Sequence, residues 1–146
     1  MPDPSGLDFV ASPLARTRET MEILRRTAGL APDGVRFDPR FAELGFGSWE
    51  GRTWKELRKQ EALLYAERER DRWGFVPPGG ESYAVLAERV GAAIADLTRD
   101  TLLVSHGGVA RALMNLRSRA HVSDVLRASI WQGRILVFDG ARHVWV

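Results

Sequence analysis

The chain has 146 residues and no cysteine; 45% of its residues are hydrophobic, 27% are charged, and its formal net charge is +2. This composition is typical of a single folded domain, and it excludes disulfides, cysteine nucleophiles and thiolate metal sites. Arginines and glutamates are interleaved between residues 54 and 72, which is typical of a solvated helix surface and argues against nucleic acid as a partner.

No apolar run is long enough to cross a bilayer, and the first ten residues lack the basic and apolar regions of a signal peptide. We therefore expect a cytoplasmic protein with no membrane partner. No internal repeat or linker divides the sequence. One domain over residues 1–146, with one functional site, is the prediction.

The first predicted unit is a strand over residues 7–11 followed directly by a helix. Ser12 is expected to cap this helix, and Pro13 suits its first turn because the missing N–H would have no intrahelical partner. Gly29 is expected to end it. Spacings of three and four residues predict one buried face, made of Leu14, Thr17, Met21, Leu24 and Ala28.

The middle of the chain is predicted to hold an ordered loop with one short strand, followed by two helices. Thr53 and Glu56 have the spacing of a capping box at the start of the first helix, which is expected to continue to about Trp73. The paired prolines and glycines of residues 77–80 indicate a loop. Ser82 can cap the second helix. Its inward stripe comprises Leu86, Val90, Ile94 and Leu97.

The last third is predicted to alternate between strand and helix before a terminal hairpin. Residues 101–105 are predicted to form a buried strand. The glycine pair that soon follows is predicted to form a tight turn, and residues 109–116 are predicted to form a helix. A short helix starts at Ser123, and Asp139-Gly140 is typical of a hairpin turn. This order predicts a three-layer α/β sandwich with a mainly parallel sheet, in which the site lies at the carboxyl ends of strands.

Polar side chains follow two of the predicted strands, beside helix N-termini that favour anions. Ser12 and Arg16 follow the first strand, and His106 and Gly107 follow the later one. Arg16 can offer a planar fork of donors to two phosphate oxygens, and glycine lets a phosphate approach the backbone near His106. A surface role for Arg16 and a structural role for His106 are the alternatives.

Glu43 lies among aromatic and apolar residues. Partial desolvation would raise the pKa of its carboxyl and let it donate a proton to a leaving alcohol. A loop carboxylate that accepts from backbone amides is the alternative. Glu81 and Ser82 are expected either to contact a substrate or to organise the start of a helix. His121 and His143 are expected to be structural or exposed.

The sequence predicts neither a metal nor an organic cofactor. Its three histidines and its acidic residues form no compact ligand motif, and it contains neither a Walker motif nor a dinucleotide-binding glycine loop.

Four segments in chain order, SPLARTRET, FAELGFGSWEG, PPGGES and VSHGGVARAL, resemble the histidine phosphatase superfamily, also called the phosphoglycerate mutase-like family. The resemblance runs from about Phe9 to the terminal hairpin. It implies that Arg16 binds phosphate, that Glu43 is the general acid, and that His106 stabilises the transferring phosphoryl group. The stretch around Glu43 looks like the phosphatase branch, which implies hydrolysis of small phosphomonoesters, with residues 77–80 bordering the substrate mouth. The candidate substrate contacts are Ser12, Gly107, Glu81 and Ser82.

One motif of that family is missing. Its members carry an Arg-His-Gly motif on an N-terminal strand, where the histidine attacks phosphorus, and this sequence lacks it. Without a phosphohistidine intermediate we expect the chain to bind inorganic phosphate or a small phosphorylated substrate and to turn it over poorly. A noncatalytic phosphate-binding or protein-interaction role is the alternative.

The same missing segment bears on the fold. In the family its strand lies beside the strand that precedes His106, so the resemblance implies an N-terminally truncated domain that lacks the first strand and helix. Unpaired backbone groups and exposed apolar surface would then favour marginal stability or self-association through the exposed sheet.

Overall fold

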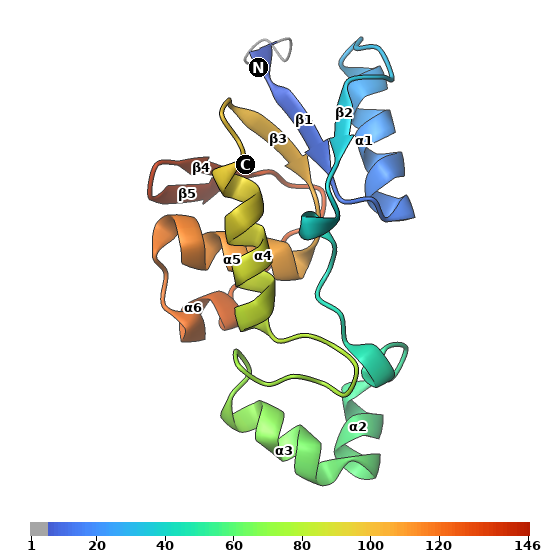
Figure 1. Cartoon of the computed structure of the whole chain (residues 1–146), viewed down its shortest axis with the longest axis vertical. Helices are drawn as coiled ribbons and strands as arrows, with labels where there is room; N and C mark the ends of the chain where they lie inside the picture. Colours follow the sequence, from blue (N-terminus) through green and yellow to red (C-terminus); the bar gives the residue numbers. More distant parts are fainter. Residues whose placement is uncertain (1–5) are drawn as a thin grey trace.

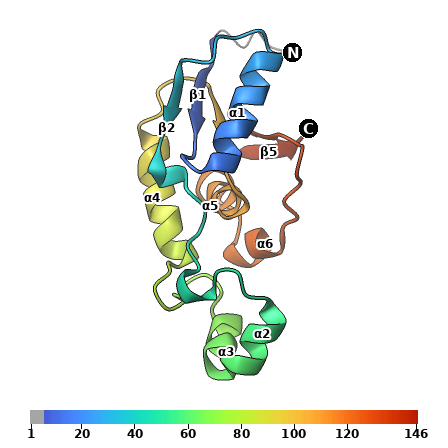
Figure 2. The ribbon, with the colours of Figure 1, turned by 90° about the vertical axis from the view of Figure 1, so that its right-hand side faces the viewer.

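The structure is a computed structural model that describes residues 6–146. Its centre is a parallel sheet with the strand order β2-β1-β3, made of β1 (Asp8–Ala11), β2 (Val35–Phe37) and β3 (Thr101–Val104). Helix α1 (Ala15–Thr27) lies on one face of the sheet, and α4 (Tyr83–Ala95) and α5 (Gly107–Ser118) lie towards the other (Figures 1 and 2). The predicted α/β architecture with a parallel sheet is confirmed.

Alternation along β1 explains these layers. Phe9 and Ala11 point to one face, where they pack against Met21 of α1. Val10 points to the other face and joins the buried cluster around Val90, between α4 and α5. Successive strand side chains face opposite sides of a sheet, and both faces of a parallel sheet are normally covered. The central strand is therefore apolar at every one of these positions.

The remaining elements extend from this core. The short 3-10 turns η2 (Pro39–Phe41) and η3 (Gly47–Trp49) precede α2 (Trp54–Gln60) and α3 (Ala62–Arg70). Both of these helices lie at the end of the molecule that is far from the sheet (Figure 1). After α5 come α6 (Val122–Arg127) and the antiparallel pair β4 (Leu136–Asp139) and β5 (Arg142–Trp145).

The start of α1 differs from the prediction. The helix begins at Ala15 with Leu14 at its N-cap, and it has no side-chain cap. Ser12 lies two residues before this N-cap; its hydroxyl lies 2.8 Å from His106 Nε2 and also accepts from the Leu14 amide at 3.4 Å. The Ser12 amide donates to the Val104 carbonyl, which continues the sheet by one residue. The polar residue after β1 thus belongs to the strand end and not to the helix.

The inward face of α1 is confirmed in part. Thr17 and Met21 are buried as predicted, but Leu14 and Ala28 are exposed. Arg25 is buried near the end of the helix instead. Its guanidinium lies over an aromatic ring of β1 and donates to two carbonyls of the loop that follows the helix. The loop therefore covers Arg25, which the sequence analysis did not place on the buried face.

The long helix predicted from Thr53 is broken into two. The capping box between Thr53 and Glu56 forms as predicted. Helix α2 ends at Gln60 because Glu61 leaves the helical backbone conformation, at φ −131° and ψ 48°. The Glu61 carboxylate accepts from Trp49 Nε1 at 2.8 Å. The break and a contact to the preceding loop thus occur at the same residue.

Two other helix starts also differ from the sequence prediction. The glycine pair after β3 forms the first turn of α5, with His106 at the N-cap, so there is no separate tight turn. Helix α6 begins after His121 and not at Ser123, because the His121 ring accepts from the Ser123 amide. The predicted cap on α4 is confirmed: the Val85 amide donates to Ser82.

Strand β3 lies at one edge of the parallel sheet, and β4 and β5 form a separate sheet within residues 6–146. For this reason β3, predicted to be buried, is only half-buried. The hairpin at Asp139-Gly140 is confirmed. Its exposed apolar residues, with those that flank it, are Ile135, Val137, Val144 and Val146. Self-association through such surfaces stays a prediction, which size-exclusion chromatography tests.

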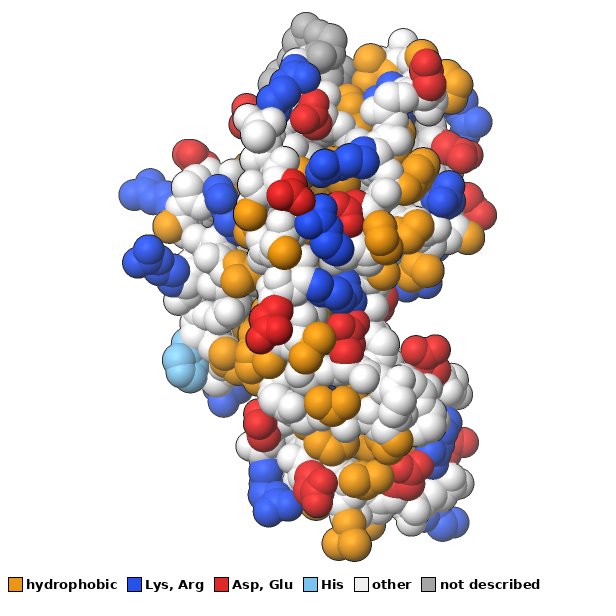
Figure 3. Space-filling view, viewed as in Figure 1, with side chains coloured by type: hydrophobic (Ala, Val, Ile, Leu, Met, Phe, Trp, Pro, Cys, Tyr) orange, Lys and Arg blue, Asp and Glu red, His pale blue; other side chains and the backbone are white. Residues whose placement is uncertain are grey.

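On the face in Figure 3, basic and acidic side chains are intermixed. The same view shows hydrophobic side chains at the α2–α3 end and also on the side of α1 and β2. Large exposed apolar residues of that part of the chain are Trp54, Leu63 and Val76, and Leu63 is 84% exposed. Within residues 6–146, no helix is both long and apolar enough to pass through a bilayer.

Candidate functional site

The candidate site lies where β1 and β3 end side by side. Their register pairs Ala11 with Val104, so the residues that follow both strands come together. Ser12 Oγ lies 2.8 Å from Nε2 of His106, and Arg16 Nη2 lies 3.1 Å from Nδ1 of the same ring. Ser12 is fully buried, the imidazole is half-buried and Arg16 is exposed. The structure thus brings three of the predicted site residues together.

These two contacts determine the tautomer of His106. A guanidinium can only donate, so Nδ1 accepts from Arg16, and Nε2 carries the proton that is directed to Ser12. Burial is the main cause that lowers the pKa of His106; the Glu43 carboxylate opposes this shift, and the guanidiniums of Arg16 and Arg89 add to it. The neutral ring is therefore favoured at pH 7. Because Ser12 accepts from this ring, the imidazole does not activate it as a nucleophile.

The Glu43 carboxylate lies at the N-terminus of α5. Its Oε1 accepts from the Gly108 amide at 3.0 Å and from the Leu44 amide at 2.9 Å. A helix N-terminus favours an anion, and here the anion is a side chain of the same protein. A Cβ at Gly108 would overlap Oε1, so glycine makes this approach possible. Glu43 therefore has the amide contacts of the structural alternative and also lies near His106.

Glu81 and Ser82 make contacts within the fold. Ser82 accepts from the Val85 amide and so caps α4. Glu81 accepts from the Gly45 amide and pairs with Arg89. Neither joins the cluster of Ser12, Arg16 and His106 in the described structure, whereas Gly107 directly follows His106 in the first turn of α5. Substrate contacts by Glu81, Ser82 and Gly107 stay predictions.

Sequence reasoning missed Arg89. This side chain donates to Glu81 and to the backbone carbonyls of Arg40 and Glu43. A signal for it exists in the pattern of α4, because position 89 is three residues after the inward-facing Leu86. A charged residue on the apolar face of a helix indicates a buried partner. The partner itself, eight residues earlier in a loop, has no such periodic signal.

The other two histidines lie outside the cluster. The exposed His121 ring accepts from the Ser123 amide at the start of α6, and His143 Nδ1 lies 2.7 Å from Ser118 Oγ. Both positions agree with the prediction that these rings are structural or exposed. Within residues 6–146, no group of three or more histidine or acidic residues could hold a metal ion.

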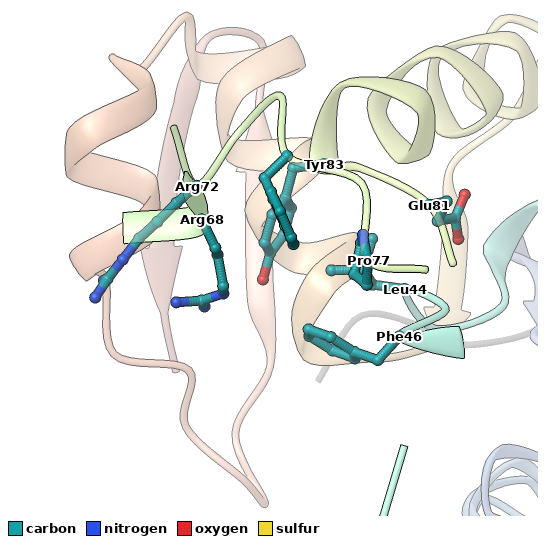
Figure 4. A pocket seen from close by; sticks show the side chains of 8 residues that line it. Leu44, Phe46, Arg68, Arg72, Pro77, Glu81 and Tyr83 are labelled. Carbon is teal, nitrogen blue, oxygen red and sulfur yellow. The ribbon is translucent and has the colours of Figure 1, made fainter. Parts of the chain in front are cut away.

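A narrow pocket opens beside Leu44, the residue that follows Glu43 (Figure 4). Burial raises the pKa of the Tyr83 phenol in its wall, against the opposing charges of nearby arginines, including Arg68. The residues that line the pocket are Leu44, Phe46, Arg68, Arg72, Phe75, Pro77, Glu81 and Tyr83. Loop residues and Arg68 of the charged α3 thus line this pocket, and the part that residues 77–80 play at a substrate mouth stays a prediction.

Comparison with known proteins identifies the family of the chain. The family model of the histidine phosphatase superfamily (branch 1) matches residues 3–146. The chain belongs to the histidine phosphatase superfamily. Among curated histidine phosphatase relatives, the adenosylcobalamin/alpha-ribazole phosphatase of Salmonella typhimurium is 31% identical over 124 residues, which are 79% of this chain and 59% of that protein. The probable phosphoglycerate mutase GpmB of Salmonella paratyphi B is 33% identical over 133 residues, which are 88% of this chain and 57% of that protein.

Solved structures give the same result for the fold. A putative alpha-ribazole-5'-P phosphatase from Escherichia coli superposes with a TM-score of 0.78 at 23% identity, covering 96% of this chain and 71% of that one. The mycobacterial glucosyl-3-phosphoglycerate phosphatase superposes with a TM-score of 0.68 at 28% identity, covering 83% and 62%. This histidine phosphatase chain spans 57% to 59% of the length of the two curated relatives. The predicted family and fold are confirmed.

Proposed function

We propose that this chain binds inorganic phosphate and small phosphomonoesters between Arg16 and His106, and that it derives from a cytoplasmic phosphomonoester hydrolase. The observation that carries the proposal is the 3.1 Å contact between the guanidinium and the imidazole at the adjoining strand ends. Two cation-forming side chains at one such edge, next to the N-terminus of α5, suit a phosphate group. The phosphatases among its relatives support a hydrolase of phosphomonoesters.

Each group of the cluster has a role in this proposal. Arg16 turns its planar fork from the ring to two phosphate oxygens, and His106 takes up a proton and donates to a third. Glu43 lies on the side of the leaving group, where a protonated carboxyl donates to the departing alcohol oxygen. The proposed roles of these three residues involve no metal or organic cofactor.

The cluster lacks a group that could attack phosphorus and so start turnover. Hydrolysis through a phosphohistidine needs a second imidazole that attacks phosphorus in line with the leaving oxygen. His121 and His143 are engaged elsewhere in the described chain, and His106 serves the transferring group. We infer that this chain binds its ligand and hydrolyses it poorly.

The test compares this chain with its His106→Ala variant in p-nitrophenyl phosphate hydrolysis and in thermal melts with phosphate or vanadate. We expect both anions to raise the melting temperature of the parent chain and not of the variant, with little turnover by either. Robust turnover that the variant loses would refute poor hydrolysis and support the site. A melting temperature that neither anion changes would refute the binding site.

The proposal predicts that sulfate binds more tightly at lower pH. Sulfate stays a dianion across this range, and its charge raises the pKa of His106, which burial lowers in the free protein. Binding then takes up a proton between the two pKa values. Affinity therefore rises as pH falls through the pKa of the bound form, and it levels off below the pKa of the free form.

Calorimetry in two buffers of different ionisation enthalpy measures this proton uptake. The His106→Gln variant, which cannot change its charge, should bind sulfate without this pH dependence. The same pH dependence in the variant would contradict the role given to the imidazole.

A further inference from the structure

Two loops meet beside Glu43, and their backbones are bonded to each other. The Glu81 amide donates to the Gly45 carbonyl at 2.9 Å, and the Ser48 amide donates to the Pro78 carbonyl at 2.9 Å. The Gly45 amide in turn donates to Glu81 Oε1 at 3.2 Å. The loop that carries Glu43 is therefore held by the loop that contains the PPGGES motif.

Glycines make this close approach possible. A Cβ at Gly80 would lie 2.5 Å from the Gly45 carbonyl oxygen, and a Cβ at Gly47 would overlap the Pro78 carbonyl. Gly47 also has a φ of +56°, which glycine adopts without strain. Larger residues at either place would push the two loops apart.

Arg89 of α4 bonds to both of these loops. Its Nε and Nη2 donate to the two carboxylate oxygens of Glu81 at 3.0 Å and 2.5 Å. Its Nη1 donates to the Arg40 carbonyl at 2.7 Å, and its Nη2 to the Glu43 carbonyl at 3.2 Å. The side chains of Arg89 and Glu81 are only 23% and 20% exposed. One guanidinium thus contacts both ends of the segment that leads to Glu43.

The carboxylates of Glu81 and Glu43 have different partners. Both oxygens of Glu81 take donors from Arg89, whose guanidinium also bonds to the Glu43 carbonyl, while the Glu43 carboxylate accepts from the Gly108 amide. Figure 4 shows Glu81 on the side of the pocket opposite to Arg68 and Arg72.

We propose that the Glu81–Arg89 pair is a positioning device that holds the Glu43 carboxylate against the N-terminus of α5, beside His106. This assignment rests on the proposed function for the role of Glu43 as general acid. In it, Glu81 and Arg89 are positioning residues and not substrate contacts. The PPGGES motif then serves the site indirectly, through Gly80 at the loop contact and through Glu81 in the pair.

The test follows the backbone amides of Leu44 and Gly108 by NMR while pH is varied. Both donate to Glu43 Oε1 in the parent chain, so both resonances should shift as Glu43 is protonated. Other titratable or charged groups nearby are His106, Tyr83, Arg68 and Arg111. The Glu43→Gln variant therefore identifies the part of each shift that belongs to Glu43.

In Arg89→Gln we expect the Gly108 amide to lose its titration while the Leu44 amide keeps it. Leu44 moves with Glu43 because the two are adjacent in sequence, whereas Gly108 belongs to α5. Gly80→Ala separates the loops without touching the ion pair, so it should have the same effect. Arg89→Lys keeps the charge but cannot make all four bonds, and should give a partial loss.

The matched control is Arg99→Gln, which removes the exposed pair with Asp8 and should leave both titrations unchanged. A folded Arg89→Gln or Gly80→Ala chain whose Gly108 amide titrates as in the parent would overturn the proposal. If Arg89→Gln does not fold, Gly80→Ala and Arg89→Lys decide it by the same reading. No phosphate is used, so a failure of phosphate binding would refute the proposed function without affecting this result.

Discussion

Replacing Arg16 by alanine should weaken the binding of inorganic phosphate by about 10- to 100-fold. Hydrogen bonds to charged groups contribute about 1.5 to 3 kcal/mol, and roughly 1.4 kcal/mol corresponds to a tenfold change in affinity. Arg16 is exposed in the first turn of α1, where alanine is well tolerated, so the fold should persist. The variant should also raise the pKa of His106, because the Arg16 charge is one of the causes that lower it. Titration calorimetry and histidine NMR measure these two effects.

Arg18 provides the matched control on the same helix. Its Nε donates to the Pro13 carbonyl at 2.8 Å, and its guanidinium lies 4.1 Å from the centre of the Phe37 ring, away from His106. Arg18→Ala should therefore leave phosphate affinity unchanged, and Arg16→Lys should lie between the two because it keeps the charge and loses the fork. Equal phosphate affinity in Arg16→Ala and the parent would mean that the Arg16–His106 contact is only a surface hydrogen bond.

Where local and tertiary preferences agree, the sequence predicts this fold well. The central strand, the capping box at Thr53, the cap at Ser82 and the hairpin at Asp139-Gly140 all follow from short-range patterns. The approach of Arg16 to His106 follows from a further rule, since parallel strands end at the same edge of a sheet. For the strand, the two caps and the hairpin, residues near in sequence carry most of the information.

The prediction fails where a distant side chain competes for a local partner. Ser12 has the residue type of a helix cap, but the helix begins only at Ala15, and the Ser12 hydroxyl contacts His106, 94 residues away in sequence. Glu61 has a good helix propensity, but it leaves the helical backbone conformation and its carboxylate accepts from Trp49, in the loop before the helix. Arg89 was missed for a different reason: its partner Glu81 lies in a loop that periodicity does not describe. Such competition cannot be read from spacing alone.

Replacing Phe41 by alanine should lower the free energy of unfolding by about 3 to 5 kcal/mol, the usual range for a large aromatic ring removed from a core. Phe41 is fully buried in the cluster that includes Leu86 and Val90 of α4. Its carbonyl also accepts from Ser105 Oγ at 2.8 Å, directly before His106. Small domains have total stabilities of only about 5 to 15 kcal/mol, so the loss would be a large part of the whole. Urea denaturation at an unchanged m value measures it.

Phe37→Ala is the control for this core variant. Its ring is 37% exposed on β2 and contacts the Arg18 guanidinium, a type of contact that contributes about 0.5 to 1 kcal/mol at exposed sites. If Phe41→Ala destabilises the chain no more than Phe37→Ala does, Phe41 is not part of a packed core.

Because Phe41 lies two residues before Glu43, a folded Phe41→Ala chain should also lose the Gly108 amide titration. Packing of α4 against this segment would then determine both the stability of the domain and the position of its candidate acid.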